Sequence, residues 1–507
     1  MPRTDQSIAQ SCSALQGRII DNVPFIDSLP STNSTASMYA RAKTACAVAK
    51  AIFPSNVVAS NDSQYMREEE FNWSETCWLP ASCFILVETT CDVIAALKMI
   101  TYVGAKFAVR SGGYNPNAGF ESIDSSGVLL DLRRLNSTSL LEGNEILQRG
   151  PGNTWGSLYD FLEGYNISVA GGRHSSVGVG GYLLGGGMSY FPNLMGLGAD
   201  SIVNVEIVLA NSSVITANSS FNSGIFFSIK GGGPNFGIVT RFDIHVHQTW
   251  RIWYSLNLYS PADYKQVLNA TVQVQSAMEQ DKKIGFFLNV NPTIIIAGLL
   301  YAEWTTSPTA FSPFSQLNSL GVYLPETNGT IASLAASINI GSTSARREPY
   351  AVTHGIDLDL YVQIQEEYIS ILESSVMPSA NLSYTIQPMG ISGINAGRVN
   401  GGNALGLVRE PQSWHVGLVE WTSADDSNAA HLAVNSLGLG VRSLAKSKDA
   451  FLEYEFMNDA SFTQNPLKSY GVDNMAKLQS TRQAYDPTGV FQNLQNSGFL
   501  LSRIIQS

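Results

Sequence analysis

The residues from Gly171 to Gly198 hold the densest glycine region of the chain and constrain its fold more than any other feature. Their sequence is GGRHSSVGVGGYLLGGGMSYFPNLMGLG. So much glycine disfavours one continuous helix, because glycine loses more backbone freedom on folding than any other residue. The apolar residues between the glycines are too many for a disordered linker. The segment is therefore predicted to be backbone of a defined shape.

Two further glycine clusters, Arg110–Tyr114 and Phe226–Val239, also adjoin apolar, strand-like runs. Glycine lets backbone N–H groups come close to a phosphorylated or extended ligand, which a side chain would prevent. Arg110, Arg173 and Lys230 lie in or beside the clusters and would add positive charge. The pattern predicts a site for a large anionic cofactor, and glycine turns used only for tight packing are the alternative.

Three common motifs are missing from these clusters. There is no GxxxxGK[ST], which excludes a P-loop nucleotide site. The run GVGGYLLGGG does not satisfy GxGxxG, so a Rossmann fingerprint is absent as well. No GxSxG occurs, which removes the commonest hydrolase elbow.

Composition narrows the class of partner. The chain has 30 basic and 41 acidic residues and a net charge of −11, which disfavours nucleic acid and a basic membrane surface. With 44% hydrophobic and 14% charged residues it is predicted to be globular with a large core. No apolar run approaches the roughly 18 residues of a membrane span, so no membrane association is expected.

Glycosylation sequons and cysteines favour the secretory pathway, with the signal peptide absent from this sequence and a cytoplasmic location as the alternative. The five cysteines all lie in the first fifth of the chain, without the spacing of a zinc site, so no metal is predicted. One or two local disulfides would fit an oxidising compartment. The ten sequons begin at Asn33, Asn61, Asn72, Asn136, Asn166, Asn211, Asn218, Asn269, Asn328 and Asn381.

The chain divides into regions of different character. A polar lead-in with a helix near Ser37–Ile52 comes first, and from Cys83 to Arg110 the pattern is strand, helix (Cys91–Val103), strand. Trp155–Glu163 is predicted to be a short helix. After about Trp250 glycine clusters thin out and aromatic and β-branched runs appear, which predicts an α+β domain with a largely antiparallel sheet.

Five motifs together resemble the fungal berberine-bridge-enzyme-like FAD-linked oxidases of the vanillyl-alcohol-oxidase superfamily. The resemblance implies a two-part, PCMH-type FAD-binding domain with an α+β substrate domain inserted into it. It places a lead-in packed on the FAD domain at 1–74, the FAD domain at 75–249, the substrate domain at 250–450 and a returning C-terminal segment at 451–507. The motifs are RSGGYNPNAGF, GPGNTWGSLYDFL, GGRHSSVGVGGYLLGGGMSYF, IKGGGPNFGIVTRFD and AYDPTGVFQN, in this order.

The resemblance also assigns cofactor-binding residues. The turn 110–114 and the stretch 175–187 would wrap the pyrophosphate and the flavin ring, and residues 237–239 would line the adenosine or ribityl side. By resemblance to secreted relatives, Cys46 and Cys83 are the expected disulfide. The predicted cofactor-binding residues are Arg110, Ser111, Gly112, Gly113, Tyr114, His174, Ser175, Ser176, Val177, Gly178, Gly180, Gly181, Gly185, Gly186, Gly237, Ile238 and Val239.

Tyr114 departs from the family pattern, which has a histidine here that bonds covalently to the flavin. His174 stands where a plant-type branch carries a second, cysteinyl attachment, so bicovalent attachment is excluded. Three interpretations of Tyr114 are open: packing against non-covalently held FAD, which is favoured, an aryl ether to the flavin, or loss of flavin chemistry.

Proton transfer needs a base near the cofactor. In the predicted strand FLEYEF, alternation puts Tyr454 on one face with Leu452 and Phe456, and Tyr454 and Asn458 are the predicted catalytic residues. A core tyrosine is the structural alternative for Tyr454. Glu420 and His415 are weaker candidates.

These features predict an FAD-dependent oxidase that transfers hydride from a small, secondary-metabolite substrate to the flavin, with O₂ as the electron acceptor. A monomer without nucleic-acid or membrane partners is expected. The alternative is a non-redox cyclase that uses the same pocket with non-covalent or lost FAD. A binding protein with a dead site is a third hypothesis, and it does not explain why so much glycine is kept.

Overall fold

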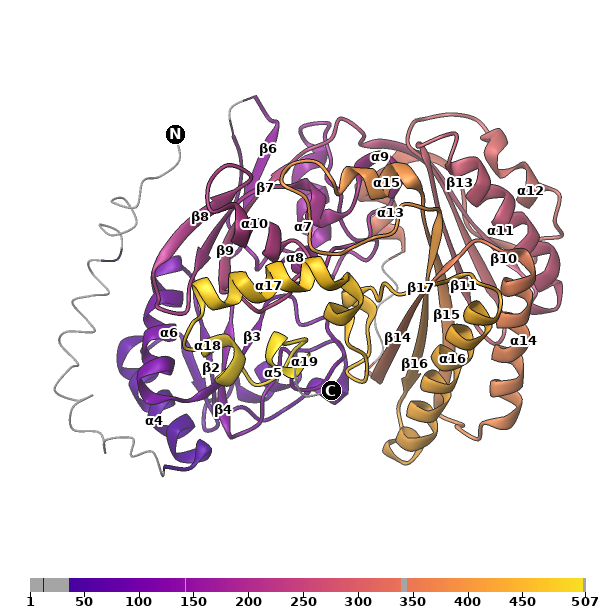
Figure 1. The fold of residues 1–507 in the computed structure, drawn as a ribbon. Coiled ribbons are helices and arrows are strands. Elements are labelled where there is room, and N and C mark those ends of the chain that lie inside the picture. The colour runs from indigo at the N-terminus through magenta and orange to yellow at the C-terminus, as the bar shows by residue number, and fades with distance from the viewer. Residues whose placement is uncertain (1–11, 13–35, 142, 339–343, 505–507) are drawn as a thin grey trace.

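The computed structural model describes residue 12 and residues 36–141, 143–338 and 344–504. These residues form three β-sheets with helices packed on them (Figure 1). Two sheets are built from strands before residue 250 and the third from strands after it. The predicted α+β class is confirmed, since antiparallel sheets and helices occur in separate layers rather than in strict alternation.

The first sheet has the strand order β1-β2-β4-β3. β2, β4 and β3 run parallel, and helix α6 (Thr90–Val103) connects β2 to β3 in the predicted strand-helix-strand unit. Reciprocal hydrogen bonds between Thr89 and Asp92 cap the start of α6. Helix α4 (Met38–Ile52) packs beside it. The strands are β1 (Val57–Ala59), β2 (Cys83–Leu86), β3 (Lys106–Arg110) and β4 (Gly127–Asp131).

The second sheet is antiparallel with the order β5-β6-β9-β7-β8. Helix α7 lies at the predicted position, Trp155–Glu163, with Thr154 as its cap. The helices α8 (Val179–Leu184), α9 (Pro192–Met195) and α10 (Ser223–Ile229) complete this part. The strands are β5 (Thr138–Leu140), β6 (Ile146–Arg149), β7 (Ile202–Val208), β8 (Val214–Asn218) and β9 (Ile238–His245).

The third sheet has eight antiparallel strands in the order β13-β10-β12-β11-β15-β16-β14-β17. Helices α11 (Tyr264–Met278), α14 (Leu358–Ser374) and α16 (Ser427–Ser447) cover its outer face, and its other face turns toward the first part of the chain (Figure 1). α12 (Ser312–Ser315), α13 (Ile331–Ser337) and α15 (Ile391–Ala396) are shorter. The strands are β10 (Arg251–Tyr259), β11 (Ile284–Val290), β12 (Ile295–Tyr301), β13 (Gly321–Thr330), β14 (Arg346–Gly355), β15 (Ala380–Met389), β16 (Gln412–Trp421) and β17 (Phe451–Leu452).

The C-terminal segment returns to the first part of the chain. It carries α17 (Val472–Tyr485), α18 (Val490–Asn493) and α19 (Leu501–Ile504), and α17 lies across the front of the first part in Figure 1. The Phe107 N–H donates to the Leu494 carbonyl (3.0 Å), and the Asn496 N–H donates to the Phe107 carbonyl (2.7 Å). These bonds attach the segment to the edge strand β3 of the first sheet.

The predicted strand FLEYEF is wrong beyond its first two residues. β17 comprises Phe451–Leu452 alone, which pair with Thr353 and His354 at the end of β14. The Glu455 N–H donates to the Ser469 side chain (3.0 Å) and not to a neighbouring strand. Beyond Leu452 this segment does not pair with any described strand; it leaves the sheet and forms a short 3₁₀ turn at Met457–Asp459.

Two disulfides tie the N-terminal region together. Cys46 in α4 bonds to Cys83 in β2, which confirms the predicted pair, and Cys12 bonds to Cys91 in α6. Cys77 is a buried free thiol. No helix in the described part of the chain is long and apolar enough to span a membrane.

Sequon exposure matches surface glycosylation at most positions and contradicts it at one. Asn33 lies outside the described residues, and Asn218 is half-buried. Asn72 is 3% exposed, and its side-chain oxygen accepts a hydrogen bond from Arg110 (3.0 Å), so this sequon is not available for glycosylation in the folded protein. The exposed sequons are Asn61, Asn136, Asn166, Asn211, Asn269, Asn328 and Asn381.

Candidate active site

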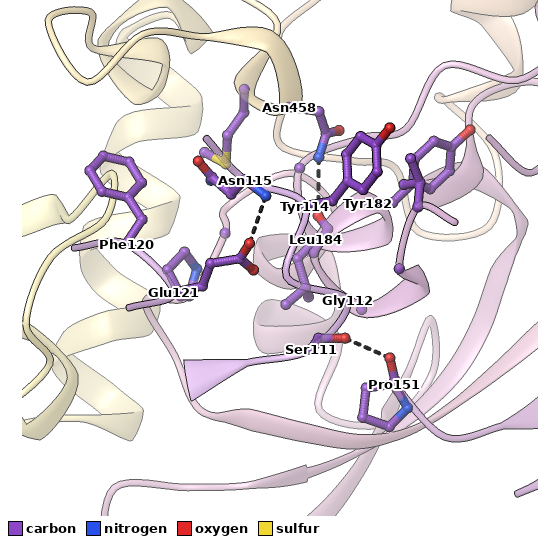
Figure 2. Close-up of a pocket in the computed structure, with 18 of the residues that line it drawn as sticks. Ser111, Gly112, Tyr114, Asn115, Phe120, Glu121, Pro151, Tyr182, Leu184 and Asn458 are labelled. Carbon is purple, nitrogen blue, oxygen red and sulfur yellow. Dashed lines mark hydrogen bonds between the residues drawn. The ribbon is translucent and has the colours of Figure 1, made fainter. Parts of the chain in front are cut away.

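A cavity of about 420 Å³ lies where the glycine turns of the first part meet strand β15 and the C-terminal segment (Figure 2). Gln387 of β15 and residues 456–459 close one side of it. The structure brings many of the predicted residues together in its lining. These are Ser111, Gly112, Tyr114, His174, Val177, Gly178, Gly180, Gly181, Gly185, Gly237, Ile238, Val239 and Asn458.

The remaining predicted residues do not line this cavity. They are Arg110, Gly113, Ser175, Ser176, Gly186 and Tyr454.

Two glycine turns touch each other directly beneath the cavity. A Cβ on Gly112 would lie 2.3 Å from the Cα of Gly178, and the same holds in reverse. Ser111 fixes the first turn by donating to the Pro151 carbonyl (2.6 Å; Figure 2). Any side chain at Gly112 or Gly178 would therefore separate the two turns.

Gly181 presents bare backbone to the cavity. A Cβ there would meet no atom within 4 Å, so packing does not explain the glycine, whereas a ligand lying against the backbone does. Its carbonyl accepts from the Asn458 amide (3.1 Å; Figure 2). Bare backbone next to touching turns fits an extended dinucleotide such as FAD.

Arg110 and Lys230 are not available as cations for that ligand, which corrects the expectation from the sequence. The buried Arg110 guanidinium pairs with Asp131 (2.7 Å) and Glu68 (3.0 Å). The Lys230 ammonium donates to the Asn400 carbonyl (3.3 Å), and burial lowers its pKa to about 8. The positive charges of Arg110 and Lys230 are therefore bound by other protein groups rather than by a ligand.

Arg173 does line the cavity. Its guanidinium donates to the side-chain oxygen of Gln387 and lies 5.2 Å from the centre of the Phe287 ring. Its backbone carbonyl is held by the Tyr190 hydroxyl (2.7 Å). Burial lowers the pKa of Arg173, and the nearby Asp459 carboxyl opposes that shift. Arg173 thus places a desolvated positive charge on the wall shared with β15.

Asp459 is the carboxyl opposite Arg173. It lines the cavity, and one oxygen accepts from the Gln387 amide at 3.0 Å. Burial raises its pKa, while the Gln387 hydrogen bond and the Arg173 charge lower it. Arg173, Gln387 and Asp459 therefore form one polar cluster drawn from three distant parts of the chain.

Glu121 is a second carboxyl on the cavity wall. Its side chain accepts from the Asn115 N–H (2.6 Å; Figure 2), which closes the turn that follows Tyr114. Burial raises its pKa to about 7. The group is therefore poised to change charge near neutral pH.

Tyr114 faces the cavity from the first glycine turn. Its ring stacks on Trp73, with centroids 4.4 Å apart and planes at 8°, and lies 5.6 Å from the His174 ring. Burial raises the pKa of the Tyr114 hydroxyl to about 12. The phenol therefore stays protonated at physiological pH.

The two predicted catalytic residues lie in different surroundings. Tyr454 is buried between Trp414 and Tyr470, and its hydroxyl has no hydrogen-bond partner among the described residues. Burial raises its pKa well above the usual value, which disfavours a base. Asn458 reaches the cavity, where its amide also accepts from the Gly187 N–H (3.0 Å) and so orders the glycine stretch.

Sequence reasoning missed Glu121, Gln387 and Asp459. Glu121 directly follows the motif that ends at Phe120, and Asp459 directly follows the predicted catalytic residue Asn458. Each therefore lies one residue beyond a position that the sequence pointed to. Gln387 carries no such signal, because an isolated glutamine in an apolar strand is indistinguishable from a structural one.

A family model described as an FAD binding domain matches residues 81–218. The FAD-dependent monooxygenase macF of Penicillium terrestre is 35% identical over 434 residues, covering 85% of this chain and 83% of that protein. The bifunctional solanapyrone synthase of Alternaria solani is 30% identical over 465 residues, covering 90% and 89%.

Solved structures show the same fold. BBE-like 1 of Physcomitrella patens matches with a TM-score of 0.76 at 18% identity, over 90% of this chain and 99% of that one. Glucooligosaccharide oxidase of Acremonium strictum, described with a 6-S-cysteinyl, 8α-N1-histidyl FAD, matches with a TM-score of 0.75 at 15% identity, over 90% and 99%.

The order of motifs, the FAD binding domain and the extent of the fungal relatives agree with one another. The chain belongs to the berberine-bridge-enzyme-like FAD-linked oxidoreductases.

Proposed function

We propose that the protein is an FAD-dependent oxidase that removes a hydride and a proton from a small secondary-metabolite substrate. One observation carries the proposal: the same cavity has bare glycine backbone at Gly181 and a partly buried polar cluster of Arg173, Gln387 and Asp459. The first suits a dinucleotide, and the second suits a substrate with an ionisable hydroxyl. FAD, when bound, supplies the hydride acceptor and returns the electron pair to O₂.

Within this proposal Asp459, rather than the predicted Tyr454, accepts the substrate proton at a carboxylate oxygen. The Gln387 amide orients the carboxyl, and the Arg173 guanidinium binds the substrate oxygen as negative charge develops there. The apolar side chains of Phe456 and Met457 line the cavity beside this cluster and exclude water.

FAD is proposed to be held non-covalently. Tyr114 stands at the position of the family's attaching histidine, and burial holds the pKa of its hydroxyl at about 12, so the phenolate needed for an ether bond is scarce. The contacting glycine turns would then provide the binding energy through backbone N–H groups and close packing.

We further propose a secreted monomer in which 75–249 and 451–507 form the FAD-binding domain and 250–450 the substrate domain. The exposed sequons and the two disulfides support the secretory assignment. The macF relative is named an FAD-dependent monooxygenase, which is a redox enzyme, so the non-redox cyclase alternative is not favoured.

The experiment mixes the purified protein with panels of phenols, hydroxylated polyketides and secondary alcohols without oxygen, and then admits labelled O₂. An oxidase bleaches its flavin anaerobically and afterwards yields one hydrogen peroxide for each O₂ consumed, with no label in the product. Label in the product indicates a monooxygenase. Anaerobic turnover while the flavin stays oxidised would contradict the proposal of redox chemistry.

A further inference from the structure

The segment Asn72–Cys77 binds the cofactor turn along its backbone. The Trp73 N–H donates to the Gly113 carbonyl (2.8 Å) and the Thr76 hydroxyl to the Pro116 carbonyl (2.9 Å). The Cys77 thiol donates to the Asn115 carbonyl (3.3 Å). Carbonyls on both sides of Tyr114 are therefore held by one short stretch of the preceding chain.

The same segment binds the substrate domain at the start of β14. The Glu75 N–H donates to the Ala345 carbonyl (2.9 Å), and the Arg347 N–H donates to the Ser74 hydroxyl (2.9 Å). The Arg347 guanidinium donates to the Trp73 carbonyl and lies 4.2 Å from the centre of the Trp73 ring. The segment thus connects the cofactor turn to the substrate domain.

Trp73 is the side chain common to both sets of contacts. One face of its indole stacks on the Tyr114 ring at 4.4 Å, and the Arg347 guanidinium makes a cation–π contact with the same indole. Arg347 in turn pairs with Glu420 of β16 (2.6 Å). A continuous line of contacts therefore runs from β16 through Arg347 and Trp73 to a ring that faces the cavity.

We propose that Trp73 is a positioning residue that fixes the Tyr114 ring for FAD and couples the cofactor turn to the substrate domain. The inference rests on the proposed use of FAD. A parallel aromatic pair contributes attraction beyond simple burial, and a cation over the indole adds to it. Where no covalent bond holds the flavin, the stack keeps Tyr114 in a single orientation before FAD arrives.

The test compares Trp73→Leu, Trp73→Phe and the matched control Trp253→Leu in the FAD-loaded protein. Trp253 is a buried indole that stacks on Phe311 at 5.6 Å and 17°, and it does not line the cavity. FAD release on dilution is followed by flavin fluorescence, and hydrogen exchange is measured in the peptide spanning 110–116. Trp73→Leu should weaken FAD binding about two- to tenfold and speed exchange in that peptide.

Trp73→Phe keeps an aromatic ring and should restore FAD affinity and exchange protection close to those of the parent protein. Trp253→Leu should leave both unchanged. Unchanged FAD release and exchange in Trp73→Leu would overturn the inference, and so would equal loss in Trp253→Leu, since that indicates general destabilisation.

Failure of the proposed function would look different. If the parent protein bound no FAD under any condition, the oxidase proposal would fail. Hydrogen exchange at 110–116 would still report on Trp73, because the peptide's protection does not require the cofactor.

Discussion

The guanidinium carbon of Arg149 lies 4.6 Å from the centre of the Trp155 ring, and none of its three nitrogens has a hydrogen-bond partner among the described residues. The side chain is fully buried. An indole face attracts a cation, yet it does not replace the hydrogen bonds that the guanidinium loses on leaving water. Burial accordingly lowers the pKa of Arg149 to about 9.

Removing this charge should stabilise the fold. We expect Arg149→Met, which keeps the length of the side chain, to raise the free energy of unfolding by about 1 to 4 kcal/mol. Arg110→Met is the matched control, because it leaves Glu68 and Asp131 unpaired and should cost about 3 to 5 kcal/mol. Urea unfolding measures both. Equal losses in the two variants would mean that Arg149 has a partner that offsets its burial.

Glu121 should make stability depend on pH near neutrality. Its folded pKa is raised from 4.5 to about 7, so the folded protein binds the extra proton in this window and stability falls as pH rises through it. Glu121→Gln keeps an acceptor for the Asn115 N–H and removes the titration. The variant should match the parent protein below the window and exceed its unfolding free energy above it, as measured by urea unfolding across pH. Parallel profiles would contradict the raised pKa.

Acid precipitation should release all of the yellow colour into the supernatant, because FAD is proposed to be non-covalent. Colour kept in the pellet of the parent protein but lost in Tyr114→Phe would instead demonstrate an ether at that hydroxyl. Tyr114→His should attach FAD covalently in a fraction of molecules, since the rest of the turn matches the family motif. Absorbance of pellet and supernatant measures each case.

Asp459→Asn should slow anaerobic flavin reduction by about two to four orders of magnitude, the usual effect of losing a positioned base. Tyr454→Phe should leave that rate within about threefold, because it removes only a hydroxyl that has no hydrogen-bond partner among the described residues. The comparison uses stopped-flow absorbance with a substrate found in the panel. A large effect of Tyr454→Phe with none from Asp459→Asn would restore the assignment made from sequence.

The glycine turns were predictable because their chemistry is local. Gly112 and Gly178 each lie in a glycine motif that is visible in the sequence, and helix α7 begins and ends where Thr154 and Gly164 signal it. Local signals of this kind need no knowledge of distant partners.

The charged residues were not predictable in the same way. Nothing near Arg110 in the sequence shows that Glu68, 42 residues earlier, neutralises it. The strand containing Tyr454 was extended too far because β14 offers pairing to only two residues of it, and sequence alternation cannot reveal the end of a neighbouring strand. Which charges face the cavity is decided by tertiary pairing.

The burial of Asn72 also bears on biosynthesis. In the folded protein its side-chain oxygen accepts a hydrogen bond from Arg110, yet Asn72 is also the acceptor asparagine of a glycosylation sequon. A sugar on this nitrogen would have no room, and it would separate the segment Asn72–Cys77 from the cofactor turn. In a secretory compartment, folding of this segment would therefore compete with N-glycosylation of Asn72. Molecules glycosylated at Asn72 would not reach the active fold.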